Sequence, residues 1–239
     1  MNRIPYGSDP FQFGHLRIPD GNGPHRVVLV VHGGFWRNKY DLQYIEPVCE
    51  ALTTAGVATW SLEYRRIGDT GGGWPGTLDD VSSAAGHLRA LAAQFNLDLS
   101  RVTALGHSAG GHLALWLGSR KKVTGVVSLA GVTDLRRAWE LKLSSTVVAD
   151  FLGGSPAEVP ERYDFASPIE QLPLGIPQRL FHGTKDESVP LEISERYVTA
   201  ARERGDDAEL ITLENAGHFE LVDPRTKEFA LVRAAVLSM

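Results

Sequence analysis

Hydrophobic positions along this chain form short continuous runs that alternate with longer stretches of helical spacing. The runs are four to eight residues long and rich in valine, leucine and isoleucine, as is typical of buried strands. They predict strands at residues 27–31, 57–64, 102–105, 123–129, 178–181 and 209–213, with an edge strand at 16–19.

Between these runs, apolar residues recur every three or four positions. The clearest case is Val81, Ala84, Leu88, Leu91 and Phe95, which would share one face of a helix. The preceding T-L-D-D at 77–80 predicts a capping box that opens this helix. Further helices are expected at 42–52, 191–204 and 225–237. The alternation predicts an α/β fold, with a mostly parallel sheet covered by helices on both faces.

One segment, residues 133–176, interrupts this alternation. It lies between two predicted strands, is longer than one helix with short loops requires, and holds several aromatic residues and prolines. We expect it to form a small lid above the strand ends, with Trp139 as a candidate for the substrate pocket. The alternative is a plain surface helix followed by a long loop.

The sequence G-H-S-A-G at 106–110 is the main candidate for catalytic chemistry. It follows the apolar run at 102–105 and precedes a helix-like stretch at 111–117. A serine on a sharp turn between strand and helix is held in strained geometry, with its hydroxyl exposed above the sheet at a helix N-terminus. Ser108 is therefore predicted to be a nucleophile, although an ordinary glycine turn is the alternative.

A nucleophilic serine requires a histidine that accepts its proton. Three histidines follow Ser108 in the chain. His112 lies one turn along the same predicted helix and should point away, and His182 reads as a strand end. His218 follows the run at 208–213 in a loop that could reach across the sheet, so His218 is the predicted base.

The histidine in turn needs a carboxylate on its other nitrogen. Asp186 lies in H-G-T-K-D-E-S-V-P at 182–190, directly after the strand that precedes the one leading to His218. Asp134, after the run at 126–132, and Glu187 are rivals. The chain order Ser, Asp, His is the one expected for this kind of motif, and Asp186 is preferred.

An oxyanion site is predicted where the strand at 27–31 ends in H-G-G-F-W at 32–36. Paired glycines allow a backbone to approach a ligand with its N–H groups exposed. Such a loop would act together with the N–H of Ala109, the residue after the nucleophile. Trp36 is placed to line a pocket, although packing is an equal alternative.

These motifs together resemble the α/β-hydrolase superfamily, and within it the esterase and kynurenine formamidase-like branch. The resemblance covers nearly the whole chain and rests on HGGFW, GHSAGG, HGTKDESVP and AGHF. It implies Ser108 as nucleophile, Asp186 as acid and His218 as base, with Gly34, Phe35 and Ala109 as oxyanion donors. The formamidase loop usually has tyrosine where this chain has Phe35, and the loop also departs from the HGGG of lipase-like esterases.

Composition narrows the remaining possibilities. A chain of 239 residues with 43% hydrophobic content can bury one sizeable core, so we expect a single domain over 1–239. The net charge of −5 and the lack of a basic cluster argue against nucleic acid. Cys49 is the one cysteine, no leader or membrane-spanning run is evident, and a cytoplasmic location is expected. No metal-ligand spacing or phosphate loop occurs, so no cofactor is expected.

The sequence thus predicts a serine hydrolase that cleaves small carboxylic esters, or related amides, through an acyl-enzyme. Two alternative enzymes are an aryl-formamidase acting on N-formyl-kynurenine and a peptidase of the prolyl-oligopeptidase type. A third alternative is a hydrolase-fold binding protein without catalysis. The oligomeric state is left open.

Overall fold

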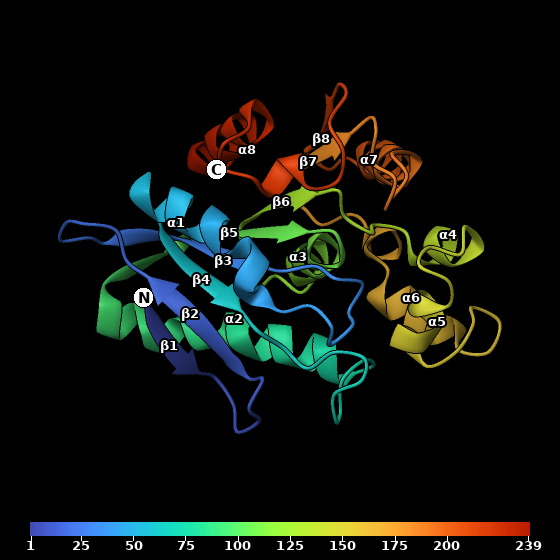
Figure 1. The fold of residues 1–239 in the computed structure, drawn as a ribbon, viewed down its shortest axis with the longest axis horizontal. Helices are drawn as coiled ribbons and strands as arrows, with labels where there is room; N and C mark the ends of the chain where they lie inside the picture. The colour runs from blue at the N-terminus through green and yellow to red at the C-terminus, as the bar shows by residue number, and fades with distance from the viewer.

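The computed structural model describes residues 1–239 and contains one eight-stranded sheet (Figure 1). The strand order is β1-β2-β4-β3-β5-β6-β7-β8. The strands are β1 (Asn2–Pro5), β2 (Phe13–Arg17), β3 (His25–Val31), β4 (Ala58–Leu62), β5 (Leu97–His107), β6 (Gly125–Leu129), β7 (Gln178–Gly183) and β8 (Ala208–Leu213).

All strand pairs from β4 to β8 are parallel, and β1 and β2 are added to the β4 edge in antiparallel orientation. The predicted α/β-hydrolase architecture with a mostly parallel sheet is confirmed. Because the strands from β3 to β8 run in one direction, their C-terminal ends meet at one edge. In open parallel sheets, that edge is where ligand sites form.

Helices cover both faces of the sheet (Figure 1). Alternate residues of β3 explain this: Val27, Leu29 and Val31 join one buried cluster, while Val28 and Val30 join another. The first cluster includes α2 (Gly76–Phe95), α3 (Ala109–Ser119) and α7 (Glu192–Glu203), and the second includes α1 (Glu46–Thr54) and α8 (Lys227–Ser238). A strand buried on both faces shows no polar alternation, which is why β3 reads as a continuous apolar run.

The structure differs from the sequence-based expectation at the sheet edge and at the start of α2. The expected edge strand at 16–19 corresponds to β2, which is covered by the unexpected strand β1. The expected capping box does not form, because α2 begins at Gly76 and no side chain caps it. Instead Thr77 donates to the carbonyl of Arg65, and Asp80 pairs with the Arg65 guanidinium.

Residues 133–176 form three short helices and a 3-10 turn between β6 and β7. They are α4 (Leu135–Glu140), α5 (Val147–Leu152), α6 (Pro160–Ala166) and η2 (Pro168–Gln171). Each of these helices buries apolar side chains in the larger cluster, so the segment is packed onto the domain. No helix has the length and apolar character needed to cross a membrane. The cytoplasmic location stays a prediction.

Candidate active site

Loops at the C-terminal edge of the sheet bring the predicted site residues together. Gly34 follows β3, Ser108 follows β5, Asp186 follows β7 and His218 follows β8. These residues are far apart in sequence, and the parallel strand order places their loops along one edge.

Ser108 occupies a strained turn between β5 and α3. Its backbone has φ 57° and ψ −121°, in a region that side chains with a Cβ rarely adopt. Close approach of neighbouring backbone explains the flanking glycines. A Cβ at Gly106 would lie 2.0 Å from the carbonyl oxygen of Gly110, and a Cβ at Gly110 would lie 2.1 Å from that of Val31. Only glycine at both positions allows this turn to pack against the sheet.

His218 and Asp186 form a short hydrogen bond. The His218 Nδ1 lies 2.6 Å from Oδ2 of Asp186, and the Asp186 side chain is almost fully buried. The other oxygen, Oδ1, accepts hydrogen bonds from the backbone N–H groups of Ser188 and Val189. Burial alone would raise the pKa of Asp186, but the bond to His218 and these two N–H groups outweigh it, so the pKa lies below its usual value.

The two rival carboxylates have other surroundings. Asp134 caps α4 by accepting from the N–H of Arg137, and it pairs with Arg196. Glu187 is exposed. His182 contacts Asp186 at 3.5 Å, but its ring nitrogens bond to the carbonyl of Val189 and the hydroxyl of Ser194.

The hydroxyl of Ser108 makes no hydrogen bond to a protein group, and His218 Nε2 has none either. In unliganded serine hydrolases this contact is often long and tightens only with substrate. The ring of His107, the residue before Ser108, has its centroid 4.5 Å from that of His218, so the loop that carries His218 lies against the end of β5.

His112, which the sequence analysis considered and rejected as the base, is buried, and its ring bonds to Trp36 and Ala166. Its Nδ1 accepts from the indole N–H of Trp36, so its Nε2 must carry the hydrogen that is donated to the carbonyl of Ala166. Burial lowers the pKa of His112 from 6.5 to about 4. The folded protein therefore holds this ring neutral at pH values where the unfolded chain would protonate it.

This arrangement predicts acid sensitivity. Because the pKa of His112 is lower in the folded state, its neutral ring carries no penalty above about pH 6.5, and stability is lost as the pH falls toward 4. At pH 5 the loss from this residue should be about 2 kcal/mol, at roughly 1.4 kcal/mol per pKa unit. The free energy of unfolding is measured with urea at pH 7 and at pH 5. We expect the decrease between the two pH values to be smaller in His112→Gln than in the unaltered protein, by that amount. Equal losses in the two proteins would contradict this assignment.

The loop after β3 lies directly against the serine. A Cβ at Gly33 would approach the Cβ of Ser108 to 2.9 Å. The backbone turns sharply here, with φ 103° at Gly34, 50° at Phe35 and 56° at Trp36. The N–H groups of Gly34 and Phe35 donate to no acceptor within the protein. Ala109 is the first residue of α3, so its N–H has no partner inside the helix.

A buried carboxylate, Glu63, supports this loop, and the sequence analysis did not identify it. Glu63 contacts His32 at 3.1 Å and Arg66 at 3.0 Å, and it accepts from the N–H of Leu42. Burial would raise its pKa, but the bond to His32 and the charges of His32 and Arg66 bring it below its usual value. No motif marks Glu63, since it follows directly after β4 without a distinctive spacing.

The two aromatic pocket candidates have different surroundings. Trp36 is completely buried, and its ring stacks on Phe151 with centroids 4.6 Å apart. It therefore packs beneath the loop, and the expectation that Trp36 lines an open pocket does not agree with its burial. The side chain is held inside because its indole N–H donates to Nδ1 of His112 and its ring packs on Phe151. Trp139, on α4, is 40% exposed and stays a candidate.

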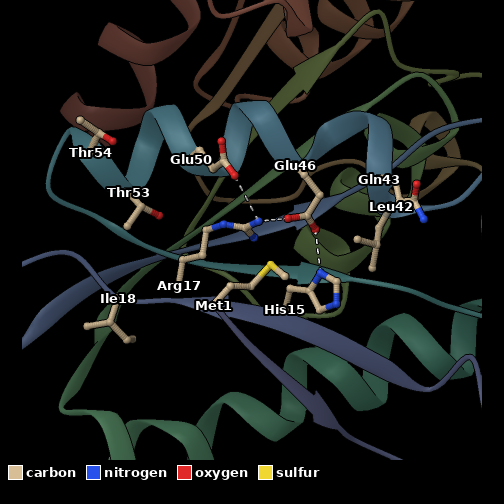
Figure 2. A pocket seen from close by; sticks show the side chains of 10 residues that line it. All are labelled: Met1, His15, Arg17, Ile18, Leu42, Gln43, Glu46, Glu50, Thr53 and Thr54. Atoms are coloured by element: carbon tan, nitrogen blue, oxygen red, sulfur yellow. Dashed lines mark hydrogen bonds and ion pairs between the residues drawn. The ribbon is translucent and has the colours of Figure 1, made fainter.

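One surface hollow lies away from this site. Its volume is about 860 Å³, and it lies between β2 and the η1–α1 segment (η1, Leu42–Ile45). Figure 2 shows that the charged groups there pair with one another, as His15 and Arg17 both converge on Glu46. Another hollow, of about 590 Å³, lies between α1 and the segment after His218, with Tyr44 and Phe219 in its lining, and none of the triad residues lines it.

No group of three or more histidine, cysteine, aspartate or glutamate side chains is arranged as a metal site. The single cysteine, Cys49, is buried in the second core cluster, and burial raises the pKa of its thiol. It therefore has no part in this site.

The family model BD-FAE matches residues 16–200, which include Ser108 and Asp186. The chain belongs to the BD-FAE family. This membership confirms the expected α/β-hydrolase superfamily, while the formamidase branch within it stays a prediction. Among curated proteins, an uncharacterized peptidase of Bacillus subtilis (strain 168) is 29% identical over 114 residues, which are 45% of this chain and 44% of that protein. The chain thus spans less than half of that relative.

Solved structures share the fold of this BD-FAE family member. An acetyl ester-xyloside bifunctional hydrolase from Caldicellulosiruptor lactoaceticus is 25% identical, with a TM-score of 0.82, over 99% of this chain and 96% of that one. A bifunctional GH43-CE protein of Bacteroides eggerthii is 24% identical, with a TM-score of 0.82, over 98% of this chain but only 37% of that one. A Thermogutta terrifontis esterase, solved with butyrate and with propionate bound, is 22% identical with a TM-score of 0.79, over 99% and 91% of the two chains. The family and these structures indicate an esterase.

Proposed function

We propose that this protein hydrolyses small carboxylic esters through an acyl-enzyme, with Ser108, His218 and Asp186 as the catalytic triad. The observation that carries the proposal is the 2.6 Å hydrogen bond between His218 and the buried Asp186, at the edge where Ser108 occupies a strained turn. A carboxylate in this position holds the imidazole in the tautomer whose Nε2 can accept a proton. The BD-FAE membership of the chain supports the same activity.

In the proposed mechanism, Ser108 Oγ attacks the ester carbonyl carbon while its proton passes to His218 Nε2. The carbonyl oxygen becomes an oxyanion, and the unoccupied N–H groups of Gly34, Phe35 and Ala109 are suited to bind it. As the carbonyl reforms, the C–O bond to the alcohol breaks and His218 protonates the alcohol. His218 then takes a proton from water, whose oxygen attacks the acyl carbon, and His218 returns that proton to Ser108 Oγ as the bond to the acyl group breaks and the acid is released.

We also propose that residues 133–176 act as a small lid of a single domain and contribute to the substrate pocket. Two contacts support this role. The ring of Phe151 stacks on Trp36, which directly follows the oxyanion loop. The backbone carbonyl of Phe151 accepts from the backbone N–H of Trp74. The exposed Trp139 lies on the same segment and remains the candidate for contact with substrate. These contacts tie the position of the lid to that of the loop that holds the oxyanion.

The leaving group of the substrate needs room beside His218, which must protonate it. The Phe219 ring contacts the ring of His218 with centroids 5.2 Å apart and is 62% exposed, so it is available to a group bound there. Aromatic rings of this kind also pack on sugar rings. The likeness to the acetyl ester-xyloside hydrolase supports acetylated carbohydrates as one class of substrate.

The substrate class is tested with initial rates on one panel of substrates. We expect nitrophenyl acetate and butyrate to be cleaved much faster than long-chain nitrophenyl esters, because the short helices of the proposed lid offer little length for a long acyl chain. Esters also require less assistance to the leaving group than amides do, so activity should show on esters first. An acetylated xyloside belongs in the same panel.

Two other outcomes would change the conclusion. A kcat/KM for N-formyl-kynurenine well above that for every short ester would favour the formamidase suggested by HGG-x-W. Cleavage of prolyl-peptide amides without ester activity would favour the peptidase, in line with the likeness to the uncharacterized peptidase of Bacillus subtilis. Absence of all three activities would support a binding protein.

A further inference from the structure

A chain of three hydrogen bonds joins the oxyanion loop to the catalytic histidine. The backbone N–H of Gly33 donates to the hydroxyl of Tyr44 at 2.5 Å. The Tyr44 hydroxyl lies 3.1 Å from Nδ1 of His107, and Nε2 of His107 lies 2.9 Å from the backbone carbonyl oxygen of His218. Gly33 follows β3, Tyr44 lies in η1, His107 ends β5 and His218 follows β8, so the chain crosses the whole site.

The two ends of this chain determine the direction of every bond in it. An amide N–H can only donate, so the oxygen of Tyr44 accepts from Gly33 and its own hydrogen is free for His107. A carbonyl can only accept, so Nε2 of His107 carries the hydrogen donated to His218. Burial and the neighbouring His218 lower the pKa of His107 to about 3, which keeps the ring neutral with Nδ1 as an acceptor. Burial raises the pKa of Tyr44, so the hydroxyl keeps its proton.

Ring contacts restrain the same residues. His107 is 1% exposed, and it meets Tyr44 edge-on with centroids 5.8 Å apart. It also contacts the ring of Phe219 at 5.7 Å. His107 is buried and Tyr44 is half-buried, and the hydrogen bonds of this network pair each of their polar groups, so breaking the bond to His107 leaves a buried polar group without a partner.

We propose that Tyr44 and His107 are positioning residues that hold the backbone of His218 and the Gly33 backbone at fixed places around Ser108. The proposal rests on the triad proposed above. Asp186 restrains the imidazole of His218 at Nδ1, but it does not restrain the backbone from which the ring projects. The carbonyl of His218 is held by His107, whose own backbone is continuous with Ser108. Because Tyr44 engages the N–H of Gly33, this bond also leaves Gly34 and Phe35 as the donors for the oxyanion.

The first test is Tyr44→Phe, which removes one hydroxyl and breaks the chain at its middle. We expect kcat to fall by about 10- to 100-fold, with KM changed less than about twofold, because displacements near 1 Å cost such factors in catalysis. The rate of inactivation by a fluorophosphonate should fall in parallel, since it reports the activation of Ser108 without a substrate.

Tyr197→Phe is the matched control. Tyr197 is also a buried tyrosine, and its hydroxyl donates to Gln178 at the opposite end of β7. This variant should lose a comparable amount of stability and keep its inactivation rate. An inactivation rate in Tyr44→Phe within twofold of the unaltered protein would overturn the proposal and leave Tyr44 a merely structural role.

Two variants at His107 test the hydrogen bond from His107 to the carbonyl of His218. They also test the proposal if Tyr44→Phe does not fold. The glutamine of His107→Gln can still donate an N–H to the carbonyl of His218, whereas His107→Leu cannot. We expect the glutamine variant to retain more of the inactivation rate than the leucine variant, and to keep the low-field proton resonance of the His218–Asp186 bond. Equal rates in the two variants would overturn the proposal.

These experiments distinguish an error in the positioning role from an error in the triad assignment. If the triad is wrong, the unaltered protein will not be labelled at Ser108 by the fluorophosphonate. If only the positioning role is wrong, the unaltered protein and Tyr44→Phe will both be labelled at Ser108, at similar rates.

Discussion

Replacing Ser108 with alanine is expected to lower kcat for a nitrophenyl ester by about 10⁴-fold or more, as in other serine triads. The hydroxyl supplies the electron pair that attacks the carbonyl, and no other nucleophile occupies this turn. Alanine has a Cβ as serine does, so the backbone strain at φ 57° should not change and the fold should be retained. Steady-state kinetics together with a thermal melt would measure both effects.

A fluorophosphonate probe provides an independent check of the same residue. Mass spectrometry should locate the label on Ser108 and on no other serine. Ser128→Ala is a suitable control, because Ser128 is buried in the neighbouring strand β6 and its hydroxyl has no hydrogen-bond partner. Near-full activity in Ser108→Ala, or a label on a different serine, would refute the assignment.

The second large effect is expected from Asp186→Asn, which should lower kcat by up to about 10⁴-fold. The reason follows from the contacts of the carboxylate. Oδ1 accepts from the N–H groups of Ser188 and Val189, so the amide oxygen of the asparagine would remain there. The amide NH₂ would then face His218 Nδ1, which could no longer donate. The ring would carry its hydrogen on Nε2 and could not accept the proton of Ser108.

Asp134→Asn is the matched control for this substitution. Asparagine is as good an N-cap as aspartate, so it can still accept from the N–H of Arg137 at the start of α4. We expect little change in kcat from this variant. If the two effects are reversed, the catalytic acid follows β6 instead of β7, and Asp134 would have to be the partner of His218 in the active enzyme.

The stability of the unaltered protein should fall in acid over two pH ranges, one for each of two groups whose pKa is lowered by folding. The lowered pKa of Asp186 means that its charge contributes stability above its ordinary titration range, and this contribution is lost as the pH falls through the folded pKa. His112 loses stability over a higher range, between about pH 6.5 and 4. Acid unfolding should therefore begin with His112 and continue with the carboxylate.

Local sequence patterns were sufficient to predict the architecture. The apolar runs that become β3 to β8 are short and continuous because parallel strands are buried on both faces, and that requirement is visible in the composition of each run. The strained turn at Ser108 is equally local, because the glycines that allow it are within two residues of the serine. Predicted boundaries were less accurate: α2 starts without the capping box, because Thr77 and Asp80 bond to Arg65 in the loop that joins β4 to the helix.

The contacts between loops were beyond the reach of the sequence. Asp186 could be ranked above its rivals from its place after the strand that precedes the one leading to His218, but only the folded chain brings its oxygen to 2.6 Å from His218. Trp36 could equally have lined a pocket or packed inside, and the backbone turn that buries it against Phe151 involves a segment more than a hundred residues away.

Tyr44 and Glu63 lie in no motif, and His107 fills a variable position of G-H-S-A-G, so tertiary structure alone shows which groups these three side chains contact. Each acts through a partner on another strand or loop, as in the bond from His107 to the carbonyl of His218. Hydrophobic periodicity and turn chemistry depend on neighbouring residues, so the sequence by itself determined the strands, the helices and the serine turn. Hydrogen bonds across the sheet edge depend on which strands lie side by side, and only the packed sheet decides that.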